Sequence, residues 1–179
     1  MGERASKLAL HQIIVDGYAR RTATKQAYGP THINGTFKSG KEFLKAAKLL
    51  RERSSHLFKP TYFAACQAIE LALKGFLRGS GSEVEWMKKK IGHNLCCALV
   101  EAEKHGLGKL VSISPEQKVV IKMINGHYAS KDLQYALSGF KQMPRIDVLL
   151  SVTEQIVDGT RKFCVDNRTF HEGKTTAIN

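Results

Sequence analysis

Residues 60–79 constrain the fold more than any other part of the sequence. Their apolar side chains recur every three or four positions, as in an α-helix, and further apolar residues fall outside that stripe, so that the segment is apolar nearly all round. Pro60 suits the first turn of such a helix, and Gly79 suits its end. Because so apolar a helix is stable only when other elements cover it on several sides, the sequence predicts a central helix in a helical bundle.

Four other segments keep the same helical period. Residues 39–54 and 146–164 keep it throughout, whereas residues 92–106 combine it with a Gly-His-Asn turn at the start and a glycine at the end. At Ser114 an N-cap serine, a proline in the first helical position and a capping-box glutamine open a further helix. Apart from an ambiguous LQYAL, no segment alternates as a strand does. We therefore expect an all-α fold, a single-domain bundle of four to five main helices with an N-terminal arm.

The bundle is expected to occupy residues 38–165. Residues 1–37 then form the N-terminal arm, with room for a short helix, and residues 166–179 form a C-terminal tail. No apolar run approaches the roughly 18 residues that a membrane helix needs, and the charged start of the chain lacks the apolar block of a secretory signal. We expect no membrane contact, a cytoplasmic location and reduced cysteines, because no Cys-x-x-Cys pair occurs.

The net charge of +12 is concentrated toward the start of the chain. Lys41, Lys45 and Lys48 repeat on one face of the helix expected at residues 39–54, and Arg51 and Arg53 follow them. Five cations in this order can track a phosphate backbone without reading bases. An ordinary solvated surface explains the same charges, so the pattern alone leaves both interpretations open.

A glutamate and a lysine interrupt the apolar surface of the central helix. Glu70 and Lys74 are four residues apart, which is the favoured spacing for an acid followed by a base, and apolar neighbours indicate a partly buried carboxylate that needs a partner. The turn at His93 and Asn94 is placed to supply that partner, with Asn94 as the N-cap of the next helix. We predict a small polar pocket of these four residues, either a structural pairing or a chemical site.

The strings AIELALKGFL and GHNL, followed by SKDLQYALSGFKQMPRIDVLL, stand in an order and at a spacing that are not commonplace. Together they resemble the HEPN superfamily, small helical-bundle domains linked to nucleotide and RNA biology, over residues 38–165. The resemblance implies a bundle of four or five helices that is often dimeric, and the apolar residues along residues 146–164 also suggest a homodimer. The best-known members are metal-independent ribonucleases of toxins and phage defence, and others are non-catalytic partners or ligand-binding modules.

The ribonuclease members carry an Arg followed by a His after four to six intervening residues, near the last helix. The His serves as base or acid toward a ribose 2′-OH and the leaving oxygen, and the Arg neutralises the phosphorane. Arg51 and His56 match this spacing, as do Arg4 and His11, but both pairs lie far from the last helix. This departure favours a binding or regulatory module over an enzyme.

We therefore expect a module that contacts RNA or nucleotide through its basic face, with no metal or organic cofactor. One alternative is a metal-independent endoribonuclease of the toxin or phage-defence type that uses Arg51 and His56. The other alternative is a protein-interaction subunit of a toxin–antitoxin or defence pair, whose partner is encoded by a neighbouring gene.

Overall fold

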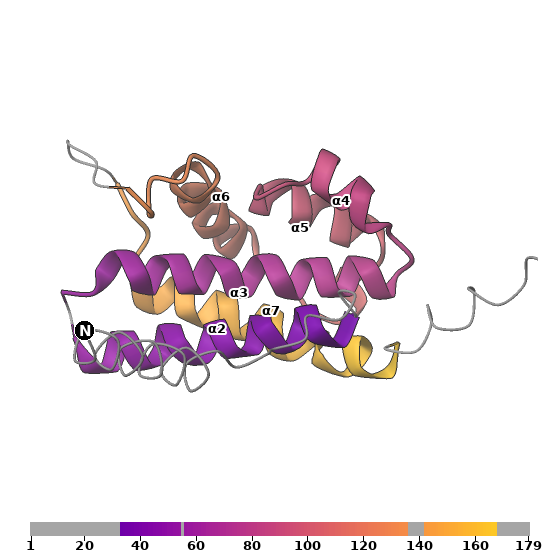
Figure 1. Cartoon of the computed structure of the whole chain (residues 1–179), viewed down its shortest axis with the longest axis horizontal. Coiled ribbons are helices and arrows are strands. Elements are labelled where there is room, and N and C mark those ends of the chain that lie inside the picture. Colours follow the sequence, from indigo (N-terminus) through magenta and orange to yellow (C-terminus); the bar gives the residue numbers. More distant parts are fainter. Residues whose placement is uncertain (1–32, 55, 136–141, 168–179) are drawn as a thin grey trace, which may run out of the picture. The chain divides into compact units, whose positions relative to one another are not determined.

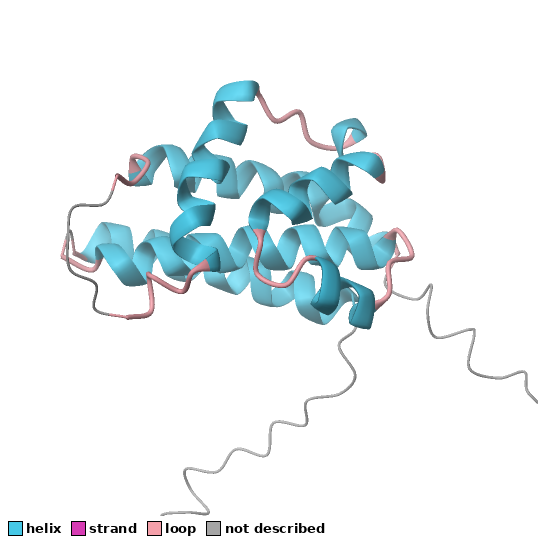
Figure 2. Ribbon diagram, turned by 90° about the horizontal axis from the view of Figure 1, so that it is seen from above, coloured by secondary structure: helices cyan, strands magenta, loops and turns pink. Residues whose placement is uncertain are grey.

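The computed structural model describes residues 33–54, 56–135 and 142–167, and in these ranges it contains helices and loops but no strand (Figure 2). The all-α class is confirmed for this part of the chain. By its contacts the chain divides into residues 1–30 and 31–179, and every described residue belongs to the second unit. The elements are α2 (Ile33–Arg53), α3 (Phe58–Gly79), α4 (Val84–Lys90), α5 (Leu95–Lys104), the 3-10 helix η1 (Leu107–Lys109), α6 (Pro115–Ala129) and α7 (Ile146–Asp166).

Helix α3 lies at the centre of the described helices (Figure 1). Helices α2 and α7 run along it on one side and contact each other, while α5 and α6 contact it from the other side. Thirteen of its 22 residues are buried, so the prediction of a central helix covered on several sides is confirmed. The physical reason is the one read from the sequence, because a helix that is apolar nearly all round gains stability only where neighbours remove it from water.

Helix α2 begins at Ile33, several residues before the start that its period predicts at residue 39. The early start follows from Phe37, which is 2% exposed and belongs to the hydrophobic core. Small residues let α2 approach α3 closely: a Cβ added at Gly40 would lie 3.3 Å from the Leu71 Cβ, and one at Gly75 would lie 3.4 Å from the Phe37 Cβ. Residues 33–37, which were expected in the arm, are therefore helical.

The predicted helix caps are present. The Asn94 side chain accepts a hydrogen bond from the Cys97 N–H at 2.9 Å and so caps α5. Ser114 and Gln117 form the reciprocal capping box of α6, and Gly106 ends α5 in the left-handed region with φ of 91°. Helix α4 is an addition to the four to five main helices expected from the sequence, because its seven residues are too few to show a helical period and only Met87 is buried.

The apolar stripe of α7 packs inside the described chain. Eight of its residues are buried, and the helix contacts α3, α2 and α6. This stripe was one of the sequence arguments for a homodimer; because its residues are buried within one chain, it does not support that prediction, which stays untested. None of the helices in the described ranges is long and apolar enough to cross a membrane. All four cysteines are free thiols, and Cys66 and Cys164 are buried.

Candidate functional site

Glu70 is a buried carboxylate on the central helix α3, with only 4% of the residue exposed. Its Oε1 accepts a hydrogen bond from the Lys74 Nζ at 2.6 Å. Its Oε2 accepts one from the Tyr128 hydroxyl at 2.5 Å and lies 3.0 Å from the His93 Nδ1. We call Glu70, Lys74, His93 and Tyr128 the Glu70 cluster; its members come from α3, α6 and the turn between α4 and α5.

Several further contacts hold these elements together. The Lys74 Nζ also donates to the Gly92 carbonyl at 2.6 Å, which ties α3 to the turn before α5. The rings of His93 and Tyr128 meet edge to face with their centroids 6.2 Å apart. The Asn125 Oδ1 accepts from the Leu95 N–H at 2.7 Å and so ties α6 to the start of α5. The cluster therefore lies where α3, α5 and α6 meet.

Hydrogen bonds keep the Glu70 carboxylate ionised despite its burial. Burial alone raises the pKa of Glu70, but the hydrogen bonds from Lys74 and Tyr128, the charge of Lys74 and the contact with His93 outweigh it, so that the pKa is lowered. The pKa of Tyr128 is raised by burial and by the Glu70 charge, so its hydroxyl stays a donor. Because an ionised carboxylate only accepts, the proton of this contact belongs to the His93 Nδ1.

The sequence predicted Glu70, Lys74 and His93 as neighbours, and the structure brings them together. Asn94, the fourth predicted member, contributes through its cap on α5. Tyr128 was missed as a member, because the sequence patterns that open a helix at Ser114 do not show where it ends, and α6 continues to Ala129. Its helical spacing from two buried isoleucines of α6, Ile121 and Ile124, is the signal that could have identified it.

Two of the five predicted phosphate-binding cations form ion pairs with α7. The Lys48 Nζ contacts the Glu154 carboxylate. The Arg51 Nε donates to Asp147 at 2.9 Å and its Nη2 at 3.3 Å, which raises the pKa of Arg51 and lowers that of Asp147. These two cations therefore contribute to the packing of α2 against α7.

The other three predicted cations, Lys41, Lys45 and Arg53, are exposed. Lys38, which the sequence interpretation did not include, is exposed one helical turn before Lys41. Within the described ranges no hydrogen bond or ion pair engages any of these four side chains. The exposed acids of the same helix are Glu42 and Glu52.

The two residues of the predicted ribonuclease pair, Arg51 and His56, make separate contacts. Arg51 is held by Asp147, and His56 is exposed in the loop before α3, where its backbone N–H donates to the Ser54 Oγ at 3.2 Å. The second matching pair, Arg4 and His11, lies outside the described residues. Among the residues that the structure describes, no group of three His, Cys, Asp or Glu side chains is placed to hold a metal ion.

Two exposed features of the described residues could bind or act on a ligand. The first is the imidazole of His93, whose side chain is 58% exposed and is backed by the Glu70 carboxylate. The second is the row of exposed cations on α2, which we call the α2 cation row and define as Lys38, Lys41 and Lys45.

Comparison with family models, with curated proteins and with solved structures found no match.

Proposed function

We propose that this chain is a HEPN-like binding or regulatory module that contacts RNA or nucleotide phosphates through the α2 cation row. The observation that supports the proposal is the spacing of Lys38, Lys41 and Lys45, which are exposed and have no carboxylate partner among the described residues. Seven residues of helix advance by about 10 Å, so the row presents three ammonium groups to successive phosphates. Lysines act as point charges on a phosphate backbone and carry no base specificity.

Binding is proposed rather than catalysis because of the contacts that Arg51 makes. A ribonuclease would use Arg51 to neutralise the phosphorane, but the guanidinium lies in a two-bond contact with Asp147 of α7. Its partner in that alternative, His56, is exposed and is separated from the Glu70 cluster along α3. Phosphate binding by the α2 cation row does not require an ion pair to break, because these lysines have no carboxylate partner among the described residues.

The salt dependence of binding to single-stranded RNA tests the proposal. Three phosphate contacts give a log–log slope of about −2, and Lys41→Gln combined with Lys45→Gln should flatten it by about 1.4. The control is Lys89→Gln combined with Lys90→Gln on α4, which removes the same charge from exposed lysines outside the row. An equal loss in the control would refute the assignment to α2. RNA cleavage that disappears in His56→Ala would favour the ribonuclease instead.

A homodimer or a protein partner is proposed at the end of the helices where α2 finishes and α3 and α7 begin, on the left of Figure 1. The Arg51–Asp147 pair joins α2 to α7 at this end, and the Tyr62 hydroxyl donates to the Pro144 carbonyl at 2.5 Å. Large apolar side chains are exposed there, namely Leu49, Leu57, Phe58 and Val148. Exposed apolar side chains are common in interaction surfaces, and these four replace the α7 stripe as the support for self-association.

A further inference from the structure

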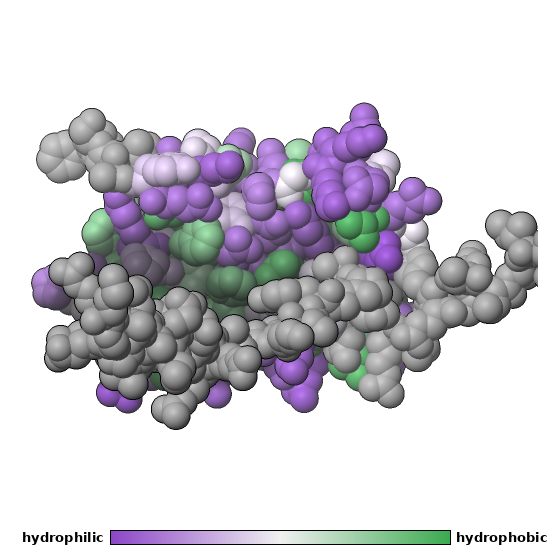
Figure 3. Space-filling model, in the orientation of Figure 1, coloured by the Kyte–Doolittle hydropathy of each residue, from purple (hydrophilic) through white to green (hydrophobic). Residues whose placement is uncertain are grey.

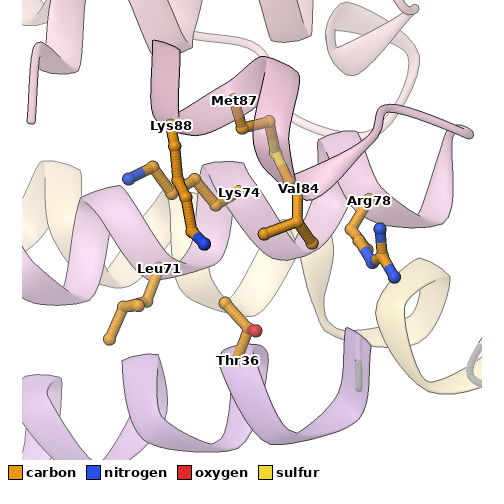
Figure 4. Close-up of a pocket in the computed structure, with 7 residues that line it drawn as sticks. All are labelled: Thr36, Leu71, Lys74, Arg78, Val84, Met87 and Lys88. Carbon is orange, nitrogen blue, oxygen red and sulfur yellow. The ribbon is translucent and has the colours of Figure 1, made fainter. Parts of the chain in front are cut away.

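A pocket of about 190 Å³ lies between α2, α3 and α4 (Figure 4). It is separate from the Glu70 cluster and from the α2 cation row, because Lys74 is the one residue that it shares with either. Its apolar wall consists of Leu71 from α3 and of Val84 and Met87 from α4. In Figure 3 hydrophobic surface lies directly below the hydrophilic residues of α4.

The polar side chains that line this wall within the described residues are cations and one hydroxyl. Lys74, Arg78 and Lys88 line the pocket together with Thr36, and none of the described lining residues carries a carboxylate. In Figure 4 Lys88 extends from α4 toward Leu71, Arg78 lies at the other end beyond Val84, and Thr36 approaches from α2. An apolar cavity ringed by positive charge is complementary to an organic anion.

The cations differ in how readily they can meet a ligand. The Lys74 ammonium already donates to Glu70 and to the Gly92 carbonyl, so its aliphatic stem is the part that serves the pocket. The Lys88 Nζ pairs with the Glu85 Oε1 at 2.7 Å, and both side chains are more than half exposed. An exposed pair of this kind is weak, so a ligand carboxylate can replace Glu85 as the partner of Lys88.

The volume of the pocket decides the size of the ligand. A cavity of roughly 150 Å³ accommodates benzene, whereas sites for drug-sized ligands and cofactors measure about 300–1,000 Å³. The pocket therefore matches a single ring or a short branched chain and is too small to enclose a nucleotide.

We propose that this pocket binds a small organic monocarboxylate with a benzene-sized apolar body. The body lies against Leu71, Val84 and Met87, and the carboxylate lies between the Lys88 ammonium and the Thr36 hydroxyl. Such a ligand contacts α2, α3 and α4 at once and so links α4 to the long helices. The assignment is independent of RNA binding, because its residues lie outside the α2 cation row.

Titration of benzoate into the full chain, followed by calorimetry and by amide chemical shifts, tests this assignment. About nine non-hydrogen atoms at an ordinary ligand efficiency give a Kd in the millimolar range. Lys88→Met keeps the aliphatic stem and should weaken benzoate binding by about tenfold. The matched control, Lys89→Met, removes an exposed charge from the same helix outside the pocket and should leave the Kd within about twofold.

Neutral and purely anionic probes separate the two parts of the site. Benzyl alcohol and inorganic phosphate should each bind more weakly than benzoate, because one lacks the charge and the other lacks the apolar body. Val84→Phe, which fills the pocket, should abolish benzoate binding while circular dichroism and the melting temperature stay near wild type. Equal binding of benzoate and benzyl alcohol, an unchanged Kd in Lys88→Met, or stronger binding of phosphate than of benzoate would overturn the proposal.

Discussion

Glu70 is tolerated in the centre of the described helices because three side chains surround its carboxylate. Lys74, Tyr128 and His93 take the place of the water that an exposed glutamate would bind. Truncation of this residue would leave the ammonium and the Tyr128 hydroxyl without their acceptor in a buried position, which is more costly than the loss of an exposed pair. The contacts of the cluster therefore favour a structural role.

Glu70→Ala should lower the free energy of unfolding by about 1–3 kcal/mol near neutral pH, as measured by urea denaturation. The pKa of Glu70 in the folded chain is below its ordinary value of 4.5, so its contribution is fully present above that value and is lost as the pH falls through the folded pKa. The difference between wild type and variant should therefore be constant above pH 4.5 and shrink below it.

The matched control is Glu85→Ala, which removes an exposed carboxylate from an i,i+3 pair and should change stability by less than about 0.5 kcal/mol. If Glu70→Ala melts like wild type but loses RNA or benzoate binding, the Glu70 cluster is a ligand site and not a structural one.

The cluster marks the limit of what residue spacing predicts. Glu70 and Lys74 share one helix, and His93 opens the next periodic segment, so local patterns identified them. The Tyr128 hydrogen bond spans 58 positions, and no local pattern specifies which residue of a distant helix meets a buried carboxylate.

At the scale of helices, the sequence predicted the helix ends that are fixed by capping side chains. It did not predict which charged faces of two helices pair with each other. The capping box at Ser114 and the cap at Asn94 depend on residues within one turn. The contact between Arg51 and Asp147 joins residues 96 positions apart, so the cations of α2 look equivalent until α7 is placed beside them. This is why the sequence predicted five phosphate-binding cations where the structure leaves three of them exposed and without described partners.

Close packing of α7 at Gly159 provides a test of the helix arrangement. A Cβ added there would lie 2.3 Å from the Val111 Cγ2 and 3.3 Å from the Val111 Cβ, and Val111 is buried. Overpacking costs about 1–3 kcal/mol, which exceeds the gain of roughly 0.5–1 kcal/mol from replacing a helical glycine by alanine. Gly159→Ala should therefore lower the melting temperature.

The same change in an open position serves as the control. A Cβ at Gly126 on α6 meets nothing within 4 Å, so Gly126→Ala should raise stability by roughly 0.5–1 kcal/mol. A stabilised Gly159→Ala variant would contradict the contact between α7 and the segment after η1.

At the scale of the whole molecule, we expect self-association through the exposed apolar end defined by Leu49, Leu57, Phe58 and Val148. Light scattering at micromolar concentration should give about twice the 19.9 kDa of one chain. Phe58→Asp should restore the single-chain mass, because a charge in an apolar interface loses its hydration without gaining a partner. Val119→Asp, at an equally exposed position on α6, should not. A wild-type mass of 19.9 kDa at these concentrations would contradict the dimer.

The net charge of the molecule, +12 over 179 residues, is complementary to a polyanion such as RNA. The most direct measurement is a fluorescence anisotropy titration of single-stranded RNA with the full chain at low salt, repeated as salt is added. The α2 cation row predicts a Kd below about 100 μM that weakens steadily as the salt concentration rises. A Kd above that value, or binding that is indifferent to salt, would contradict RNA contact through these lysines and leave the protein-interaction alternative.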